Sequence, residues 1–154
     1  MTLTDLVAPA AIVPALKVNN KKQAIQELAA RAAELTGQSE RAILEILLQR
    51  EKLGSTAVGN GVAIPHGKLS KLGRLFGLFA RLERAIDFEA LDGQPVDLIF
   101  LLLAPEAAGA DHLKALARAA RLLRDSEITR KLRNSRDADA LHALLASPVA
   151  STAA

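Results

Sequence analysis

The sequence predicts a single-domain α/β sandwich, in which a mixed β-sheet is flanked by helices on both sides. Apolar residues recur with helical spacing in both the first and the last third of the chain. Strand-like segments lie between them, and one of these, residues 96–104, is almost entirely apolar. A strand of that composition is typical of the centre of a sheet that is covered on both faces. Helices before and after such strands indicate a layered domain, which we expect to span residues 1–146.

Two helices are expected before the first strand. The first covers about Lys21–Leu35, with Asn20 as a suitable N-cap and Gly37 just beyond its end. The second begins after Ser39 and ends before Gly54. Both segments place apolar residues three and four positions apart, which is the spacing of one helix face.

Three strands are expected next. Residues 62–64 form a short strand that ends at Pro65, within a glycine-rich segment that otherwise reads as a loop. Residues 75–82 direct apolar side chains to one face and Arg81 to the other, which predicts a partly exposed strand. Residues 96–104 form the buried central strand and end before a proline.

Three more helices are expected after the strands. The longest runs from about His112 to Arg124, with Asp111 as its cap and an apolar face that begins at Leu113. Two shorter helices cover residues 127–133 and 138–145. Residues 147–154 are small and lack periodicity, so we expect a flexible tail there.

Composition and charge exclude several classes of protein. The 154-residue chain has a net charge of +3 and no cysteine, so it has neither a disulfide framework nor a thiol nucleophile. Its N-terminus lacks the basic segment of a signal peptide, and its longest apolar run, residues 98–104, is too short to cross a bilayer. We therefore expect a cytoplasmic protein without stable membrane insertion.

Cofactor and nucleic-acid motifs are also missing from the sequence. No two histidines have the spacing of metal ligands, and neither a P-loop nor a dinucleotide-binding loop is complete. We therefore expect neither a metal nor a cofactor. The only aromatic residues are four phenylalanines, which leaves few platforms on which the bases of a nucleic acid stack.

His66 is the residue best placed for chemistry. It lies between Pro65 and Gly67, where the proline stiffens the approach to the imidazole and the glycine leaves it unobstructed. A neutral imidazole nitrogen is a good nucleophile near pH 7, and a backbone carbonyl can hold the other nitrogen. Proline and glycine flank residues of ordinary turns in the same way. The local sequence is therefore equally compatible with a catalytic and with a purely structural role for His66.

Two further residues are candidates to join His66. Arg50 closes the second helix just before the glycine-rich segment, and its planar guanidinium can bind two oxygens of a phosphoryl group. His112 is expected in a first helical turn, where it can donate a hydrogen bond to a phosphoryl oxygen. The simpler interpretation of both Arg50 and His112 is that each is an exposed surface residue without a role in catalysis. His142, inside the last helix, is expected to be a boundary residue with a satisfied hydrogen bond.

Two runs of residues are specific when they are taken together. Residues 50–56 (Arg-Glu-Lys-Leu-Gly-Ser-Thr) and 59–68 (Gly-Asn-Gly-Val-Ala-Ile-Pro-His-Gly-Lys) resemble the active-site region of the fructose/mannitol-type enzyme IIA family. This family is a component of the bacterial phosphoenolpyruvate-dependent phosphotransferase system. Residues 91–98 and 110–114 also look like it, and the resemblance extends to about residue 145. It is closest to the nitrogen-regulatory branch of the family.

The resemblance implies a phosphotransferase that acts as a protein-histidine phosphoryl carrier. His66 would match the phosphorylated histidine, with tele-phosphohistidine as the product, while Arg50 and His112 would match the active-site arginine and the second histidine. A histidine phosphocarrier protein would supply the phosphate. The phosphorylation state would then regulate target proteins such as transporters or sensor kinases. Further candidates for phosphate binding in the loop are Gly67, Thr56 and Asn60.

Three alternatives stay open from the sequence. A sugar-specific enzyme IIA would use the same His66 chemistry but pass the phosphate to a IIB domain for sugar uptake. A non-catalytic binding module would keep the glycine-rich loop for structure alone. A nucleic-acid binder would use the arginines of the 112–124 helix, although the charge is modest and no recognition motif is present.

Overall fold

The central apolar segment forms strand β6 (Val96–Pro105), and the rest of the fold is arranged around it. The computed structural model describes residues 2–147. In it, β6 pairs with the antiparallel strand β5 (Phe76–Ile86) on one side. On the other side it pairs with two short parallel strands, β3 (Val62–Ala63) and β4 (His66–Leu69). The sheet is therefore mixed, as the sequence predicts.

Three of the six strands lie outside the segments expected to be strands. β1 (Ile12–Leu16) pairs with β5, and β2 (Ala57–Gly59) pairs with β3, so these two short strands form the edges of the sheet. β4 begins directly after Pro65, so the glycine-rich segment is largely paired and is not a loop. Short strands that contain proline or glycine show little apolar alternation, which is why the sequence does not reveal them.

The predicted strands differ from the observed ones mainly at their ends. β3 ends one residue earlier than expected. β5 begins at Phe76 and continues to Ile86, beyond the expected end at Leu82. The sequence did not reveal this extension, because it contains the exposed residues Glu83 and Arg84 and so lacks apolar alternation. From Leu98 to Ala104 every side chain of β6 is fully buried. The prediction of a central strand covered on both faces is confirmed.

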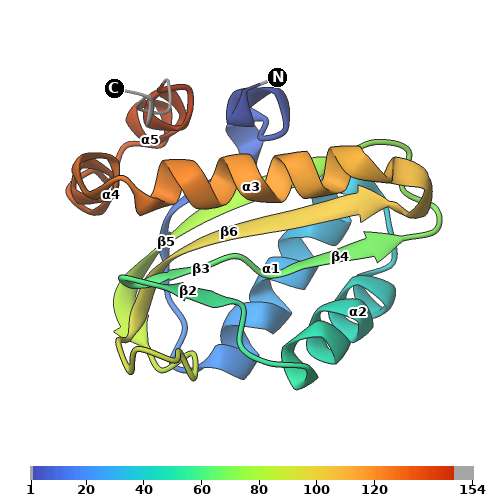
Figure 1. Cartoon of the computed structure of the whole chain (residues 1–154), viewed down its shortest axis with the longest axis horizontal. Helices are drawn as coiled ribbons and strands as arrows, with labels where there is room; N and C mark the ends of the chain where they lie inside the picture. The colour runs from blue at the N-terminus through green and yellow to red at the C-terminus, as the bar shows by residue number, and fades with distance from the viewer. Residues whose placement is uncertain (1, 148–154) are drawn as a thin grey trace.

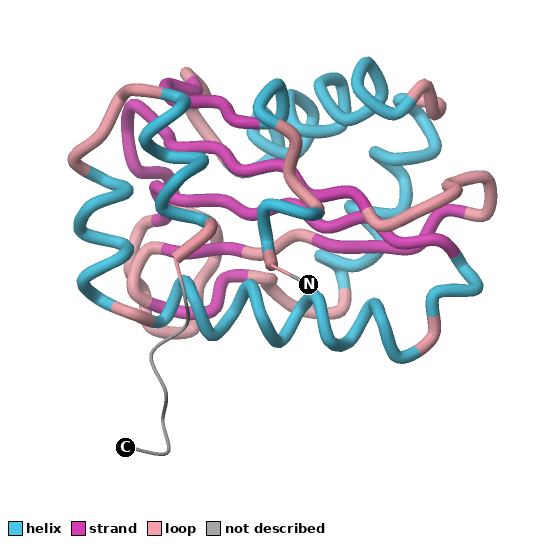
Figure 2. The backbone as a smooth tube through the Cα atoms, turned by 90° about the horizontal axis from the view of Figure 1, so that it is seen from above, coloured by secondary structure: helices cyan, strands magenta, loops and turns pink. Residues whose placement is uncertain are grey.

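Helices cover both faces of the sheet (Figures 1 and 2). α1 (Lys21–Thr36) and α2 (Glu40–Lys52) lie on one face, and α3 (Ala110–Arg124) lies on the other. The side chains of Asn20 and Ser39 accept hydrogen bonds from backbone N–H groups three residues further on, so the two expected N-caps are confirmed. The predicted α/β sandwich is the observed fold.

The start of α3 corrects two expectations. The helix begins at Ala110, Gly109 is its N-cap, and Asp111 lies in the first turn and does not cap it. Leu113, expected on the buried face, is 66% exposed, whereas His112 is buried. Each residue turns a helix by about 100°, and the many alanines of this helix leave several faces almost equally apolar. The sequence therefore could not select the face that packs on the sheet.

Two short helices complete the described chain. α4 (Ser126–Arg133) is capped by Asp125, and α5 (Ala138–Leu145) is capped by Asp137 and packs on β1. Within residues 2–147, no helix is long and apolar enough to cross a bilayer. The tail expected at residues 147–154 lies, apart from Ser147, outside the described residues. The 3-10 turns are Leu3–Asp5, Pro9–Ala11 and Glu106–Ala108.

Gly77 in β5 offers a test of how closely this core is packed. Gly77→Ala is expected to lower the free energy of unfolding by about 1–3 kcal/mol. The new Cβ would lie 2.9 Å from Cγ2 of Val7 and 3.1 Å from Cζ of Phe100. Gly73→Ala is the matched control, because nothing in the described part of the chain lies within 4 Å of a Cβ there. Urea denaturation measures both variants, and equal unfolding midpoints would contradict the packing.

Candidate active site

The ring of His66 is held in one tautomer. His66 is the first residue of β4 and pairs with Leu102 of β6. Its Nδ1 lies 2.8 Å from the carbonyl oxygen of Ile64. Because a carbonyl oxygen only accepts hydrogen bonds, Nδ1 carries the proton and Nε2 of the neutral ring keeps a lone pair. Nε2 is therefore the ring atom with an available lone pair, and it is the atom that carries the phosphoryl group in a tele-phosphohistidine.

Arg50 reaches Nε2 of His66 from the last turn of α2. Its Nε donates a long hydrogen bond of 3.3 Å to Nε2, and its Nη1 donates one of 2.9 Å to the carbonyl oxygen of Gly54. The second bond anchors the guanidinium beside the imidazole. The structure thus brings together the two residues that the sequence singled out, and it places a cation next to Nε2 of His66.

His112 approaches His66 from the first turn of α3. The two ring centroids are 5.9 Å apart, with the ring planes tilted by 47°. His112 is only 7% exposed, so the interpretation as an exposed first-turn residue is wrong. Burial lowers the pKa of His112, and the nearby charges of His66 and Lys68 lower it further. The ring is therefore neutral near pH 7.

The neutral ring of His112 has a preferred tautomer. Among residues 2–147, its buried Nδ1 has no hydrogen-bond partner. An orphaned buried N–H group is rarer in proteins than an acceptor whose lone pair is unused. This favours the tautomer of His112 that carries its proton on Nε2.

Gly67 brings α2 close to β4. A Cβ at Gly67 would lie 2.7 Å from Cδ1 of Ile46 and 3.2 Å from its Cγ1. Arg50 follows Ile46 by one helical turn and so lies on the same side of α2. The missing side chain at Gly67 therefore lets the arginine come within reach of His66. The role of Gly67 in phosphate binding stays a prediction. Its role in packing α2 against β4 is observed in the structure.

Thr56 does not present its hydroxyl to His66. The side chain is buried, and its Oγ1 donates to the carboxylate of Glu51. The carbonyl oxygen of Thr56 accepts a 3.0 Å hydrogen bond from the N–H of Ile64. The contacts of Thr56 thus orient the backbone next to His66, and they lend no support to a direct contact with phosphate.

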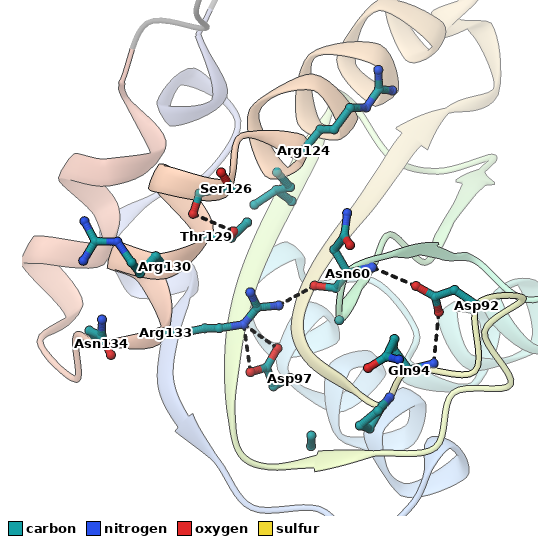
Figure 3. A pocket seen from close by; sticks show the side chains of 14 residues that line it. Asn60, Asp92, Gln94, Asp97, Arg124, Ser126, Thr129, Arg130, Arg133 and Asn134 are labelled. Carbon is teal, nitrogen blue, oxygen red and sulfur yellow. Dashed lines mark hydrogen bonds and ion pairs between the residues drawn. The ribbon is translucent and has the colours of Figure 1, made fainter.

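Asn60 is also separated from His66. Val62, two residues after Asn60, pairs with Leu98 of β6, whereas His66 pairs with Leu102. Leu98 and Leu102 are four residues apart, which corresponds to about 13 Å along a strand. Asn60 lies in a groove of about 870 Å³ near the start of β6 (Figure 3). The expectation that Asn60 binds the phosphate carried by His66 therefore has no support in this geometry.

Several polar groups of that groove bind one another. Arg133 pairs with Asp97 at 2.9 Å and donates to the carbonyl oxygen of Asn60 (Figure 3). Asp92 accepts a 3.0 Å hydrogen bond from the N–H of Asn60. These contacts tie the β2–β3 turn to α4 and β6. Arg133, Asp97 and Asp92 are therefore engaged in holding these elements together.

Sequence reasoning missed Glu51 as a residue of this site. Glu51 directly follows Arg50, and its side chain is 7% exposed and forms a 2.8 Å ion pair with Lys21. One signal was available. A carboxylate in the last turn of a helix opposes the helix dipole, so its presence there calls for a specific partner.

The prediction for His142 is confirmed, since its Nε2 lies 2.9 Å from the carbonyl oxygen of Val7.

Comparisons with known proteins agree with this arrangement. Residues 5–147 match the family described as phosphoenolpyruvate-dependent sugar phosphotransferase system, EIIA 2. The chain is 75% identical over 153 residues to a nitrogen regulatory protein of Bradyrhizobium diazoefficiens, covering 99% of this chain and 100% of that protein. It is 42% identical over 127 residues to one of Klebsiella oxytoca, covering 82% and 78% of the two chains. The crystal structure of nitrogen regulatory protein IIA-Ntr from Neisseria meningitidis gives a TM-score of 0.88 at 35% identity, with coverage of 93% and 98%.

His112 is expected to titrate below its ordinary pKa of 6.5, and Lys68→Gln should raise that pKa by removing a positive charge. The raised pKa should stay below 6.5, because burial, the largest cause of the shift, is unchanged. NMR titration of the ring protons measures it, with Lys71→Gln as the control. An unaltered pKa in the Lys68 variant would contradict the proximity of the two side chains.

The same shift predicts how stability depends on pH. A histidine whose pKa is lowered by folding binds a proton more readily in the unfolded chain. Its contribution to stability is therefore complete above pH 6.5 and is lost as the pH falls from there toward the lower pKa of the folded state. Chemical denaturation of wild type and of His112→Gln across this range should show a shallower loss in the variant. Parallel curves would count against the shift.

Proposed function

Because this chain belongs to the EIIA type-2 family of the phosphoenolpyruvate-dependent sugar phosphotransferase system, and within it to the nitrogen regulatory proteins, we propose that it carries a phosphoryl group on Nε2 of His66. The observation that carries the proposal is the hydrogen bond between Nδ1 and Ile64, which leaves the lone pair of Nε2 beside Arg50. A histidine phosphocarrier protein is the proposed donor. The phosphorylated and unphosphorylated forms would act differently on regulatory targets.

The proposed reaction is an in-line transfer between two imidazoles. Nε2 of His66 attacks phosphorus and forms an N–P bond while the N–P bond of the donor breaks, and the electron pair of the broken bond stays on the donor ring. No proton has to leave the attacking atom. The ring of His66 gains positive character, which the Ile64 carbonyl at Nδ1 is oriented to stabilise. The transition state of such a transfer is loose, so positioning and charge stabilisation dominate catalysis.

Arg50 and His112 would divide the stabilisation of the phosphoryl oxygens. The N–H of Arg50 that now points to Nε2 would turn to an oxygen as the lone pair is consumed, while Gly54 keeps the guanidinium in place. His112 would donate from a neutral ring. A neutral donor holds the phosphoryl group less tightly than a second cation, which suits a carrier that must also release it.

Exposed leucines next to the site suit a docking partner. Leu53, which follows Arg50 by three residues, is 84% exposed, and Leu113, beside His112, is 66% exposed. These two side chains are the proposed points of apolar contact with the partner protein. A phosphoryl group on His66 would add about −1.5 to −2 charges there, by analogy with other phosphorylated side chains. The proposed regulation of target proteins, such as transporters or sensor kinases, uses that change.

The nitrogen-regulatory reading is favoured over sugar transport. The nitrogen regulatory protein of Bradyrhizobium diazoefficiens matches nearly the whole length of both chains at 75% identity, whereas a fructose-specific EIIABC component of Bacillus subtilis matches 92% of this chain at 34% identity. A sugar-specific enzyme IIA would share the chemistry at His66. The two functions therefore differ only in the molecule that receives the phosphoryl group from His66. Transfer of phosphate from His66 to a IIB domain and on to a sugar would restore the sugar-specific alternative.

Phosphorylation can be followed with phosphoenolpyruvate, enzyme I and the cognate phosphocarrier, by weighing the intact protein. Wild type should gain one acid-labile phosphoryl group, and His66→Ala should gain none. Arg50→Lys should lower the rate by about 10²–10³-fold, because it keeps the charge but loses the anchored fork. His142→Gln, on the far side of the fold, is the control. No phosphate on wild type, with a phosphocarrier shown to be charged, would refute the proposed function and favour a binding module.

A further inference from the structure

The carboxylate of Glu51 is buried next to Arg50 and is fully engaged. Its side chain is 7% exposed, and Oε2 lies 2.8 Å from Nζ of Lys21, whose side chain is 16% exposed. The N–H of Thr56 lies 3.3 Å from both carboxylate oxygens, and the hydroxyl of Thr56 donates to Oε1. A buried carboxylate is costly unless it is paired and hydrogen-bonded on all sides, as this one is. We call this set, Lys21, Glu51 and Thr56, the Glu51 latch.

The Glu51 latch joins three separate parts of the chain. Lys21 opens α1, Glu51 is in the last turn of α2, and Thr56 ends the turn that follows α2. Nζ of Lys21 also lies 5.0 Å from the centre of the Phe88 ring. Ser55, inside the same turn, donates a 2.7 Å hydrogen bond to the carbonyl oxygen of Phe88. The turn formed by residues 54–56 is therefore fixed from several directions.

Two of the three groups that would act on the phosphoryl group, His66 and Arg50, are oriented by the backbone of this turn. The carbonyl oxygen of Thr56 accepts from the N–H of Ile64 at 3.0 Å, and the carbonyl oxygen of Ile64 accepts from Nδ1 of His66 at 2.8 Å. The carbonyl oxygen of Gly54 accepts from Nη1 of Arg50 at 2.9 Å. A shift of residues 54–56 would thus disturb the tautomer of His66 and the place of Arg50 together.

We propose that Glu51, acting through Lys21 and Thr56, is a positioning residue for phosphoryl transfer at His66; this proposal rests on the proposed function. Glu51 touches no reacting atom. It holds the turn whose carbonyl groups keep the lone pair of Nε2 directed at the donor and the guanidinium of Arg50 beside it. Thr56, a candidate phosphate ligand from the sequence, then acts in the same reaction through the backbone.

Thr56→Val and Thr56→Ser form a matched pair for testing the Glu51 latch. Valine keeps the shape of the side chain and loses the hydroxyl, whereas serine keeps the hydroxyl. Thr56→Val and Glu51→Gln should lower kcat for phosphorylation by about 10–100-fold, the loss typical of a displacement of reacting groups by about 1 Å. KM for the phosphocarrier should change less than about 2-fold, since the buried side chains do not meet the partner, and Thr56→Ser should restore kcat.

Asp97→Asn is the control for a merely structural effect. It weakens a partly buried ion pair with Arg133 at the other end of β6, so it should lower the free energy of unfolding without lowering kcat. If Glu51→Gln fails to fold, the Thr56 pair still tests the latch. Folded Thr56→Val protein with the kcat of wild type would overturn the proposal.

A second measurement separates this proposal from the proposed function. The ¹⁵N chemical shifts of the His66 ring report which nitrogen carries the proton, without any phosphate. Wild type should show the proton on Nδ1, and Thr56→Val and Glu51→Gln should show a larger share on Nε2, unlike Asp97→Asn. If wild type accepts no phosphate, the proposed function fails, and these shifts alone decide the positioning. An identical tautomer in all variants would overturn it.

Discussion

The complete burial of β6 is the constraint on which the rest of the structure depends. A strand with no exposed side chain from residue 98 to residue 104 needs sheet partners along both edges and a helical layer on each face. β5 satisfies one edge, and the short strands β3 and β4 share the other. Pairing with β6 puts His66 opposite Leu102. The chain that leaves β6 then turns back as α3, which carries His112 to the same place.

Burial sets the protonation state of one of the three side chains in the candidate site. His66 is half-buried and is oriented by the backbone, whereas His112 is buried far enough that its pKa falls and it stays neutral. Arg50 supplies the permanent cation and is tethered by a carbonyl oxygen of its own turn. The three side chains come from a strand and from helices on opposite faces of the sheet. Their meeting point is the end of β6, where both helical layers can reach the sheet edge.

The sequence allowed much of this architecture to be predicted, for identifiable physical reasons. The caps of α1 and α2 are local interactions between a side chain and amides three residues away, so Asn20 and Ser39 could be identified directly. β6 was evident from its composition. The meeting of Arg50 with His66 was expected from the place of Arg50 just before the glycine-rich segment and from the resemblance, and their hydrogen bond supports it.

The failures also have physical reasons. β1, β2 and β4 are strands because partners distant in the sequence pair with them, and their own residues contain no such signal. The buried face of α3 is chosen by the sheet from several alanine-rich faces, which is why Leu113 and His112 exchanged their expected environments. Thr56 and Asn60 lie close to His66 in the sequence. A hairpin nevertheless carries Asn60 along β6 away from it, and Glu51 engages the hydroxyl of Thr56.

The proton on Nδ1 of His66 has a consequence for how a signal would pass through this protein. In the proposed transfer that proton stays where it is, and the donor ring recovers a lone pair as His66 spends one. The proposed exchange therefore needs no proton to leave His66, and it leaves the kind of bond that stores the phosphoryl group unchanged. With the same kind of bond on both sides, the proposed transfer can run in either direction. Under this proposal, the phosphorylation state of His66 would follow the supply of the charged phosphocarrier.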